Sequence, residues 1–556
     1  MDRAVRPYYT SGGATPDPRS ISATRVIGLI NIFTAVARIL GGKPGAAILG
    51  LSALVAAWIA LFGGFVFFID SVDFFDYAAR LVHFRIGSYY DAIGYPLLIR
   101  FTGFTRTGSL IPVVVCQAVF AALTPWLAFR TFAPLDRKIG VAAATVSLAS
   151  LTPFFFQNTF FHDGLSLFLG FLSITFASMF FHFQRSRYIH LSSASAMCAY
   201  LTQPAVIGFF LGCWGAFMLF ALRDRRQIKH VLAALGIFAA TIFCVSTFEK
   251  WSMREDHLAD SPSLLGRQIF YNEYLRGAPN ASFSGSAADE LRAALVRYFG
   301  HSSARLHSYI AEKFEGRTDV YQRLFGQYEG RPVELVRQIF AQPNHDYFDV
   351  MWNFPDLPDK LPDSMFLHAS LAYLYFHPGV VAGYVSRNLI DFMAGSPWRC
   401  TGDQVFPACR IDERVTFYPA LDSVTLAPGR MPDNAYRFLI ARRVSQGFPM
   451  LAAASMWQWI YYHFRLPLLG AMLLGWVASF WVSSALRWTL GAFVVAYIVN
   501  LTVFSFLAEP GLRYQIVGIS MCAFAAGGGA CLILNCLVRA AAMVLSKEVD
   551  RNAGGG

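Results

Sequence analysis

Residues 46–81 read AAILGLSALVAAWIALFGGFVFFIDSVDFFDYAARL, and this stretch decides the fold class. Residues 46–69 form an uncharged apolar run that stops at Asp70. A run of about 18 or more such residues is long enough to cross the hydrocarbon of a bilayer as a helix. The run therefore predicts a transmembrane helix, and Asp70, Asp73 and Asp76 follow it at the edge of the membrane.

The composition of the whole chain agrees with this prediction. Only 15% of its 556 residues are charged, whereas soluble domains carry about 25%. We therefore expect a polytopic α-helical membrane protein with about ten transmembrane helices. The apolar runs that predict these helices lie near 46–69, 109–131, 139–156, 164–183, 189–203, 205–222, 230–248, 466–484, 488–507 and 515–538.

The runs divide the chain into five parts, which are 1–45, 46–249, 250–465, 466–540 and 541–556. The first part is a cytoplasmic tail with an amphipathic interfacial helix at 22–40. The second is a module of seven transmembrane helices with outer loops at 70–108 and 155–164. The third is an outer, periplasmic domain of mixed structure. The fourth holds three further transmembrane helices, and the last is a second cytoplasmic tail.

The formal net charge of +11 follows the membrane topology. The arginines and lysines cluster in short connections between apolar runs, and cytoplasmic loops of membrane proteins carry such an excess of positive charge. They are Arg130, Arg137, Lys138, Arg185, Arg187, Arg223, Arg225, Arg226, Lys229, Arg539 and Lys547. The charge therefore gives no sign of a nucleic-acid partner.

The segment WRCTGDQVFPACRID places Cys400 and Cys409 in the expected outer domain. Two cysteines this close in an exported loop indicate a local disulfide in an oxidising compartment. A metal-binding pair is the alternative, although the sequence offers no further His or Cys at a suitable spacing.

Unusual polar residues follow the apolar runs on one side of the predicted topology. An ionisable group at the membrane edge is costly unless it is paired or hydrated, so each of these residues is a functional candidate. Asp70, Asp73 and Asp163 could instead cap helices, and Arg513 could extend to lipid headgroups beside Glu509. The loops that carry them all face one side of the membrane, which favours a common site.

Several of these residues lie in motifs that resemble those of bacterial GT-C membrane glycosyltransferases. This group includes the protein O-mannosyltransferase-like enzymes and the lipid A aminoarabinose transferase. The motifs are DSVDFFDYAARL (70–81) with GYPLLIR (94–100), FHDGLSLFL (161–169), LTQPAVIGFFL (201–211), YLYFHPGVVAGYVSRNLIDFM (373–393) and EPGLRY (509–514). In LTQPAVIGFFL, Gln203 stands where these enzymes usually carry a base. Segment 373–393 resembles the amphipathic juxtamembrane helix of their outer domain.

The resemblance implies an inverting transfer of a sugar from a polyprenyl-phosphate donor to a hydroxyl acceptor on the outer face of the membrane. Asp70 would be the general base, with Asp163 as the second catalytic carboxylate and Asp73 in support. Arg513 and Tyr514 would stabilise the departing phosphate. The other residues of the donor site would be Glu509, His162, Tyr95 and Gln203.

The resemblance also implies the partners and the location. The acceptor would be a glycan, a lipid or a protein, and the protein would lie in the bacterial cytoplasmic membrane with its site facing the periplasm. No cofactor is assigned. Whether Asp70 and Asp163 bind a divalent cation is left open by the sequence. The alternatives from other classes are a transporter or flippase of lipid-linked substrates, and a polymerase or ligase of surface polysaccharide.

Overall fold

The computed structural model describes the helical bundle of the chain and parts of the segment 250–465. The described residues are 42–62, 74–75, 77–79, 81, 93–158, 160, 162–203, 206–223, 225–255, 266, 269–270, 285–301, 325–328, 330–341, 363–394, 434–435, 437, 464, 466–507 and 512–553. No β-strand occurs within these residues, so the described part of the chain is all-α.

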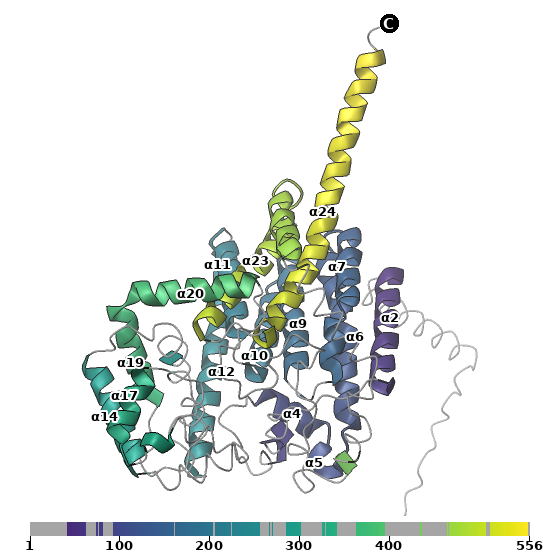
Figure 1. Ribbon diagram of the computed structural model, residues 1–556. Coiled ribbons are helices and arrows are strands. Elements are labelled where there is room, and N and C mark those ends of the chain that lie inside the picture. The colour runs from purple at the N-terminus through teal and green to yellow at the C-terminus, as the bar shows by residue number, and fades with distance from the viewer. Residues whose placement is uncertain are drawn as a thin grey trace, which may run out of the picture.

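The main helices run side by side as a bundle (Figure 1). They are α2 (Gly42–Phe62), α6 (Ile111–Phe132), α7 (Arg137–Ala149), α9 (Asp163–Phe183), α10 (Arg187–Thr202), α11 (Ile207–Arg223), α12 (Ile228–Glu255), α23 (Ser484–Leu507) and α24 (Leu512–Ala553), together with Leu466–Ser479. Neighbours in the chain pack as antiparallel pairs, with α6 on α7, α9 on α10 and α11 on α12, because their connections are short.

Six of the described helices are long and apolar enough to cross a membrane, which makes the chain a multi-pass α-helical membrane protein. They are Gly42–Phe62, Ile111–Phe132, Asp163–Phe183, Arg225–Val245, Ser484–Val503 and Met521–Ser546. The bent pair Arg137–Ala149 and Thr152–Asn158 would add a seventh. The other predicted spans coincide with α10, Phe210–Leu222 and Leu466–Ser479, which are shorter than about 18 residues. The expected number of ten therefore stays a prediction.

Two segments that the sequence predicted as single helices are divided at prolines. The run 139–156 breaks after Ala149, where Leu151 has a left-handed φ of 53° and Pro153 lies in the first turn of α8 (Thr152–Phe155). The segment 373–393 breaks at His377, between α19 (Asp363–Phe376) and α20 (Pro378–Ala394). Proline has no N–H to donate to a preceding turn, and it suits the first turn of a new helix.

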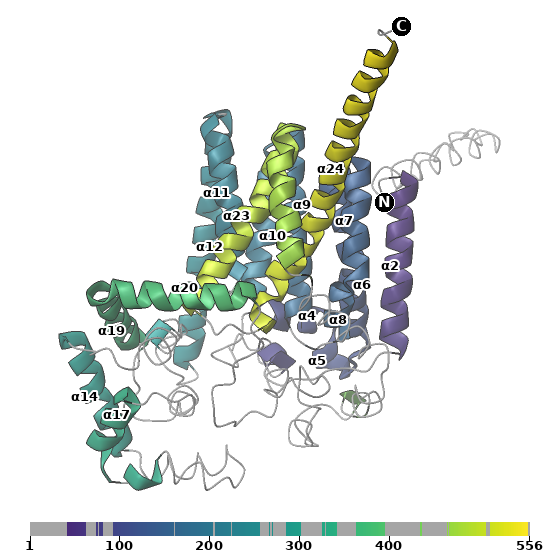
Figure 2. The same ribbon diagram turned by 45° about the horizontal axis from the view of Figure 1, so that its top comes forward.

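The bundle has two chemically different ends. The short connections α6–α7, α9–α10 and α11–α12 lie at one of them, the basic end, which contains Arg137, Lys138, Arg185, Arg187, Arg225, Arg226 and Lys229. The opposite end, the α4 end, holds α4 (Gly94–Phe101), α5 (Phe104–Thr107), α8 and η2 (Phe156–Asn158) (Figure 2). The charge predicted for cytoplasmic loops is therefore gathered at a single end of the bundle.

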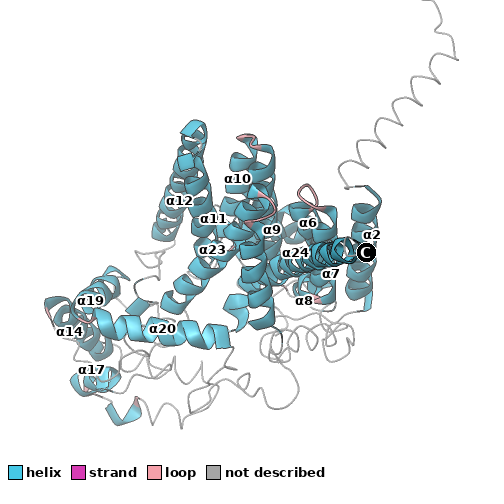
Figure 3. Cartoon of the chain, turned by 90° about the horizontal axis from the view of Figure 1, so that it is seen from above, coloured by secondary structure: helices cyan, strands magenta, loops and turns pink. Residues whose placement is uncertain are grey.

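Helices of the expected outer domain form a group on the side of the α4 end (Figure 2). Here α14 (Ser286–His301) packs on both α17 (Pro332–Ala341) and α19, and the ring of Phe270 lies 5.4 Å from Phe366 and 5.9 Å from Phe340. α20 crosses from this group to the bundle and packs on α23 (Figure 3).

The interfacial helix at 22–40 and the pair Cys400 and Cys409 lie outside the described residues, so both stay predictions.

Hydroxyl groups join neighbouring helices inside the bundle. Thr131 Oγ1 in α6 lies 2.9 Å from Thr175 Oγ1 in α9, and Ser178 Oγ lies 3.1 Å from Thr489 Oγ1 in α23. All four side chains are buried. Some of these hydroxyl groups also lie within hydrogen-bond distance of backbone carbonyl oxygens, as Thr131 Oγ1 does of the Leu127 oxygen over 2.9 Å, and the contacts between side chains join the three helices.

α11 and α23 approach each other closely at Gly212. A Cβ atom at this position would lie 2.3 Å from the Cα atom of Ala496, a distance that no side chain tolerates. Small residues permit such contacts between transmembrane helices, whose association depends on van der Waals packing. Gly215, in the next turn of α11, has open space at the same place.

We expect Gly212→Ala to destabilise the bundle and Gly215→Ala to leave its stability unchanged or slightly higher. Both substitutions improve helix propensity by about 1 kcal/mol, so the difference between them isolates the contact with Ala496. The unfolding midpoint of the purified protein in detergent measures this. A midpoint that falls equally in both variants would contradict the close approach of the two helices.

Candidate functional site

Asp163 and Gln203 are brought together by the hairpin of α9 and α10. Asp163 is the first residue of α9, and Gln203 directly follows the end of α10. Gln203 is extended, with φ −150° and ψ 97°, because the following Pro204 disfavours helical backbone at this position. The chain therefore leaves α10 at the level at which α9 begins.

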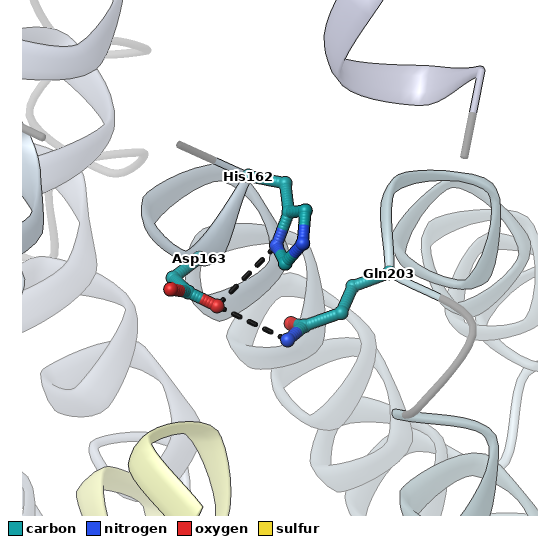
Figure 4. A network of polar contacts seen from close by, with 3 residues as sticks. All are labelled: His162, Asp163 and Gln203. Carbon is teal, nitrogen blue, oxygen red and sulfur yellow. Dashed lines mark hydrogen bonds and ion pairs between the residues drawn. The ribbon is translucent and has the colours of Figure 1, made fainter. Parts of the chain in front are cut away.

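A hydrogen bond joins the two side chains. Gln203 Nε2 donates to Asp163 Oδ1 over 3.0 Å, and Nδ1 of His162 lies 3.3 Å from the same oxygen (Figure 4). The side chain of Asp163 is 1% exposed and that of His162 is 16% exposed, so the imidazole lies at the rim of the site. The carboxylate bonds across to the end of α10 and does not cap its own helix, which was the alternative from the sequence.

The second oxygen of this carboxylate has no hydrogen-bond donor among the described residues. Asp163 Oδ2 is buried and unpaired there, and the same holds for Gln203 Oε1. Buried polar atoms are nearly always hydrogen-bonded, and a charged group is costly to leave without a partner. Oδ2 therefore keeps its capacity to accept a hydrogen bond or a proton.

Aromatic rings connect the first predicted loop to His162. The ring of Phe74 packs edge-on against His162 at 5.4 Å and against Tyr95 at 5.3 Å between centroids. Tyr95 is fully buried in α4, and its hydroxyl group accepts a hydrogen bond of 3.0 Å from Gln117 Nε2. Burial raises the pKa of the Tyr95 phenol, so this group stays protonated. Tyr95 thus supports the wall of the site.

α4 is packed tightly on the end of α10. A Cβ atom at Gly94 would lie 2.5 Å from Thr202 Oγ1 and 2.8 Å from the carbonyl oxygen of Leu201. Glycine alone permits this approach, because it has no Cβ atom. The motifs GYPLLIR and LTQP, which are far apart in the sequence, are therefore in direct contact at the α4 end.

α24 begins at this end of the bundle as well. The ring of Phe524 in α24 lies 4.3 Å from that of Phe171 in α9, and both helices run from the α4 end toward the basic end (Figure 2). Arg513 and Tyr514 belong to the first turn of α24, although their side chains lie outside the described residues. The backbone of the predicted phosphate-binding pair is therefore at the same end as the carboxylate.

The structure brings together three of the predicted site residues, His162, Asp163 and Gln203, and it places Tyr95 beside them through Phe74. Asp70, Asp73 and Glu509 lie outside the described residues, and their roles stay predictions. Among the described side chains, no group of three His, Cys, Asp or Glu is arranged to hold a metal ion. Whether Asp70 and Asp163 hold a cation stays open, because only Asp163 is among the described residues.

The sequence patterns did not identify three supports of the site, which are Phe74, Gln117 and Gly94. Gln117 carries a signal that could have revealed it, because it is the only amide side chain in the apolar run 109–131. Phe74 and Gly94 lie inside the motifs DSVDFFDYAARL and GYPLLIR, but the motifs did not indicate what these two residues contact. A ring-to-ring contact and a close approach of two backbones exist only in the folded chain.

Comparison with known proteins identifies no relative: the chain matches no protein-family model, and no curated protein sequence matches it. The similarity of its short motifs to those of membrane glycosyltransferases therefore stays a resemblance.

We expect Asp163→Asn to unfold at the temperature of the wild type or above it, and Asp163→Ala to unfold below it. Asparagine keeps an oxygen for Gln203 Nε2 and removes a buried charge, whereas alanine leaves that N–H group without an acceptor at a cost of about 1–3 kcal/mol. Unfolding midpoints of the three purified proteins measure this. An equally lowered unfolding midpoint in both variants would show that the fold requires the charge of Asp163.

Proposed function

We propose that the chain is a GT-C type membrane glycosyltransferase, which moves a sugar from a polyprenyl-phosphate donor to a hydroxyl acceptor. The observation that carries the proposal is the buried Asp163 carboxylate, with one oxygen bonded to Gln203 and the other unpaired among the described residues. Phe74, which directly follows Asp73, packs against the neighbouring His162. Two carboxylate-bearing motifs therefore approach each other where a lipid-linked substrate would leave the hydrocarbon.

The reaction requires a base, an acceptor and a leaving group in line. A carboxylate takes the proton of the acceptor hydroxyl group, and the hydroxyl oxygen attacks the anomeric carbon of the sugar. The new C–O bond forms as the bond from the anomeric carbon to the phosphate oxygen breaks, and the lipid phosphate leaves with the electron pair. Attack from the face opposite the phosphate inverts the anomeric centre. A positioned general base contributes about 10²–10⁴-fold to the rate.

We assign the base to Asp70 and the orientation of the acceptor to Asp163. Asp70 stands four residues before Phe74, so their Cα atoms are at most about 14 Å apart. The hydrogen bond from Gln203 fixes the direction of the Asp163 carboxylate and leaves Oδ2 for the acceptor. If the enzyme uses a divalent cation, these two carboxylates are its protein ligands.

Gln203 holds Asp163 without neutralising it. An arginine at this position would pair with the carboxylate and compete for its oxygens, whereas a neutral amide adds no positive charge beside it. Stabilisation of the donor phosphate then falls to Arg513 and Tyr514. The N-terminus of α24, where both residues stand, adds a partial positive charge that also favours a phosphate.

We place the α4 end outside the cell membrane and the basic end in the cytoplasm. Short loops that are rich in Arg and Lys stay in the cytoplasm, and the basic end gathers such loops. With ten spans, this orientation puts the site and helices α14, α17 and α19 on the periplasmic side of a bacterial inner membrane. A glycan, lipid or protein acceptor would reach the site from the side of these helices.

Asp70→Asn should abolish the transfer of the sugar, because asparagine cannot take the proton of the acceptor. In cells that lack the gene, the wild type should restore a sugar-sized mass on an envelope glycan, lipid or protein, and Asp70→Asn should lower its rate of formation about 10²–10⁴-fold. Asp76→Asn, which removes the same charge from the same loop, should restore it fully. Mass spectrometry of the cell envelope measures the product, and normal product with Asp70→Asn would rule out this base.

Purified protein in detergent separates transfer from transport. A transferase forms a covalent product from a polyprenyl-phosphate sugar without any sealed compartment, whereas a flippase forms none. Translocation of the lipid-linked sugar in sealed proteoliposomes, without a covalent product under either condition, would overturn the proposal in favour of the flippase.

Arg513→Ala should raise KM for the lipid-linked donor more than KM for the acceptor. The variant loses a charge-assisted hydrogen bond of about 1.5–3 kcal/mol, which corresponds to at least a tenfold change. Arg539→Ala, in the same helix but near the basic end, is the matched control and should change neither constant. Steady-state kinetics with each substrate varied in turn decide this, and equal effects on donor and acceptor would count against a phosphate contact.

A further inference from the structure

An open hollow of about 870 Å³ lies at the basic end of the bundle. It is formed by the α9–α10 turn and by η4 (Arg225–Gln227) with the start of α12. The charged and titratable residues that line it are Arg185, Arg187, Arg225, Arg226, Lys229 and His230. The 21 residues of α9 separate this hollow from Asp163 by about 30 Å, so the two sites are distinct.

The hollow is strongly cationic. Five Arg and Lys side chains line it, and no Asp or Glu is found among its described lining residues. Asp224, which precedes Arg225 in the chain, lies outside the described residues. Several guanidinium groups around one concavity favour a phosphate, because each can donate two parallel hydrogen bonds to its oxygens.

The membrane topology explains why positive charge lies at this end but does not explain its concave arrangement. Charge in any short cytoplasmic loop serves to orient the chain, and Arg137 and Lys138 do so outside the hollow. The cations of the hollow come from two different loops, which the packing of α10 against α12 brings together. The fold thus places the cations of two loops on one surface that can bind an anion.

Apolar side chains beside the hollow face outward. Leu232 lines the hollow and is 51% exposed, Leu222 at the end of α11 is 64% exposed, and Phe183 at the end of α9 is 45% exposed. In helices that cross a membrane, such residues contact acyl chains. The cations therefore adjoin lipid-facing apolar surface, as the phosphate of a phospholipid adjoins its own acyl chains.

We propose that this hollow binds the phosphate headgroup of an anionic membrane lipid. Arg185 and Arg225 donate hydrogen bonds to the phosphate from the two loops, while an acyl chain lies along Leu222 and Leu232. Basic pockets between transmembrane helices at the cytoplasmic face are places where anionic headgroups bind. The inference does not depend on the transferase activity, since it uses none of the residues of the Asp163 site.

Titration of the full-length protein in detergent with lipid, followed by native mass spectrometry, tests this binding. We expect phosphatidylglycerol to bind more tightly than phosphatidylcholine, and Arg185→Gln/Arg225→Gln to weaken phosphatidylglycerol binding roughly tenfold or more, as expected for the loss of charge-assisted contacts. Arg137→Gln/Lys138→Gln removes the same charge from the same end and should leave the binding unchanged.

The proposal is overturned if the control variant weakens binding equally, or if phosphatidylcholine binds as tightly as phosphatidylglycerol. Displacement of the lipid by glycerol phosphate at equal concentration would assign the hollow to a soluble phosphate instead. A monodisperse size-exclusion peak shows that each variant folds. If the glutamine variant gives none, Arg185→Lys/Arg225→Lys keeps the charge but loses the paired donors, and undiminished binding by this variant would also overturn the proposal.

Discussion

The hydrocarbon of a bilayer offers no water to backbone N–H and C=O groups, so a crossing helix bonds them within itself, and the rest of this structure follows from that constraint. The segments that cross are helices, and their buried hydroxyl groups pair with one another, as those of Thr131 and Thr175 do. Ionisable groups are costly inside such a bundle and stand where helices begin and end. Asp163 begins α9 and Gln203 follows α10. Polar side chains in this fold therefore come together where the ends of helices lie side by side.

The identity of the partner decides what a buried carboxylate can do. A permanent cation would neutralise Asp163 and make it part of the framework. The amide of Gln203 orients the carboxylate and brings no charge of its own, and the imidazole of His162 pairs with the same oxygen only when it is protonated. A buried charge of this kind weakens folding relative to an uncharged group of the same shape. Residues of functional sites commonly lower the stability of the fold. In the proposed transferase, the charge of Asp163 orients the acceptor hydroxyl group beside the base.

The helices were predictable from the sequence because uncharged apolar runs have few alternatives in a membrane, and each predicted run overlaps a described helix. The breaks at Leu151 and His377 were less predictable, since a single proline can either bend a helix or start a new one. At the site, the pairing of Asp163 with Gln203 depends on the hairpin that places two helix ends at one level. Spacing along the chain does not contain that information. The contact of Gly94 with Thr202 likewise forms only in the folded chain, so the spacing of the two residues does not predict it.

The two ends of the bundle would meet different phosphates. In the proposed transfer the donor phosphate leaves at the α4 end during the reaction, so it would be bound near a carboxylate base and only transiently. In the hollow of the basic end the described lining has cations and no carboxylate, which suits a headgroup that stays bound. This hollow includes the start of α12, and α12 leads from the basic end toward the segment that forms α14 and α17. A lipid held there would fix the depth of α12 in the membrane, and with it the depth of the chain segment that leads to α14 and α17.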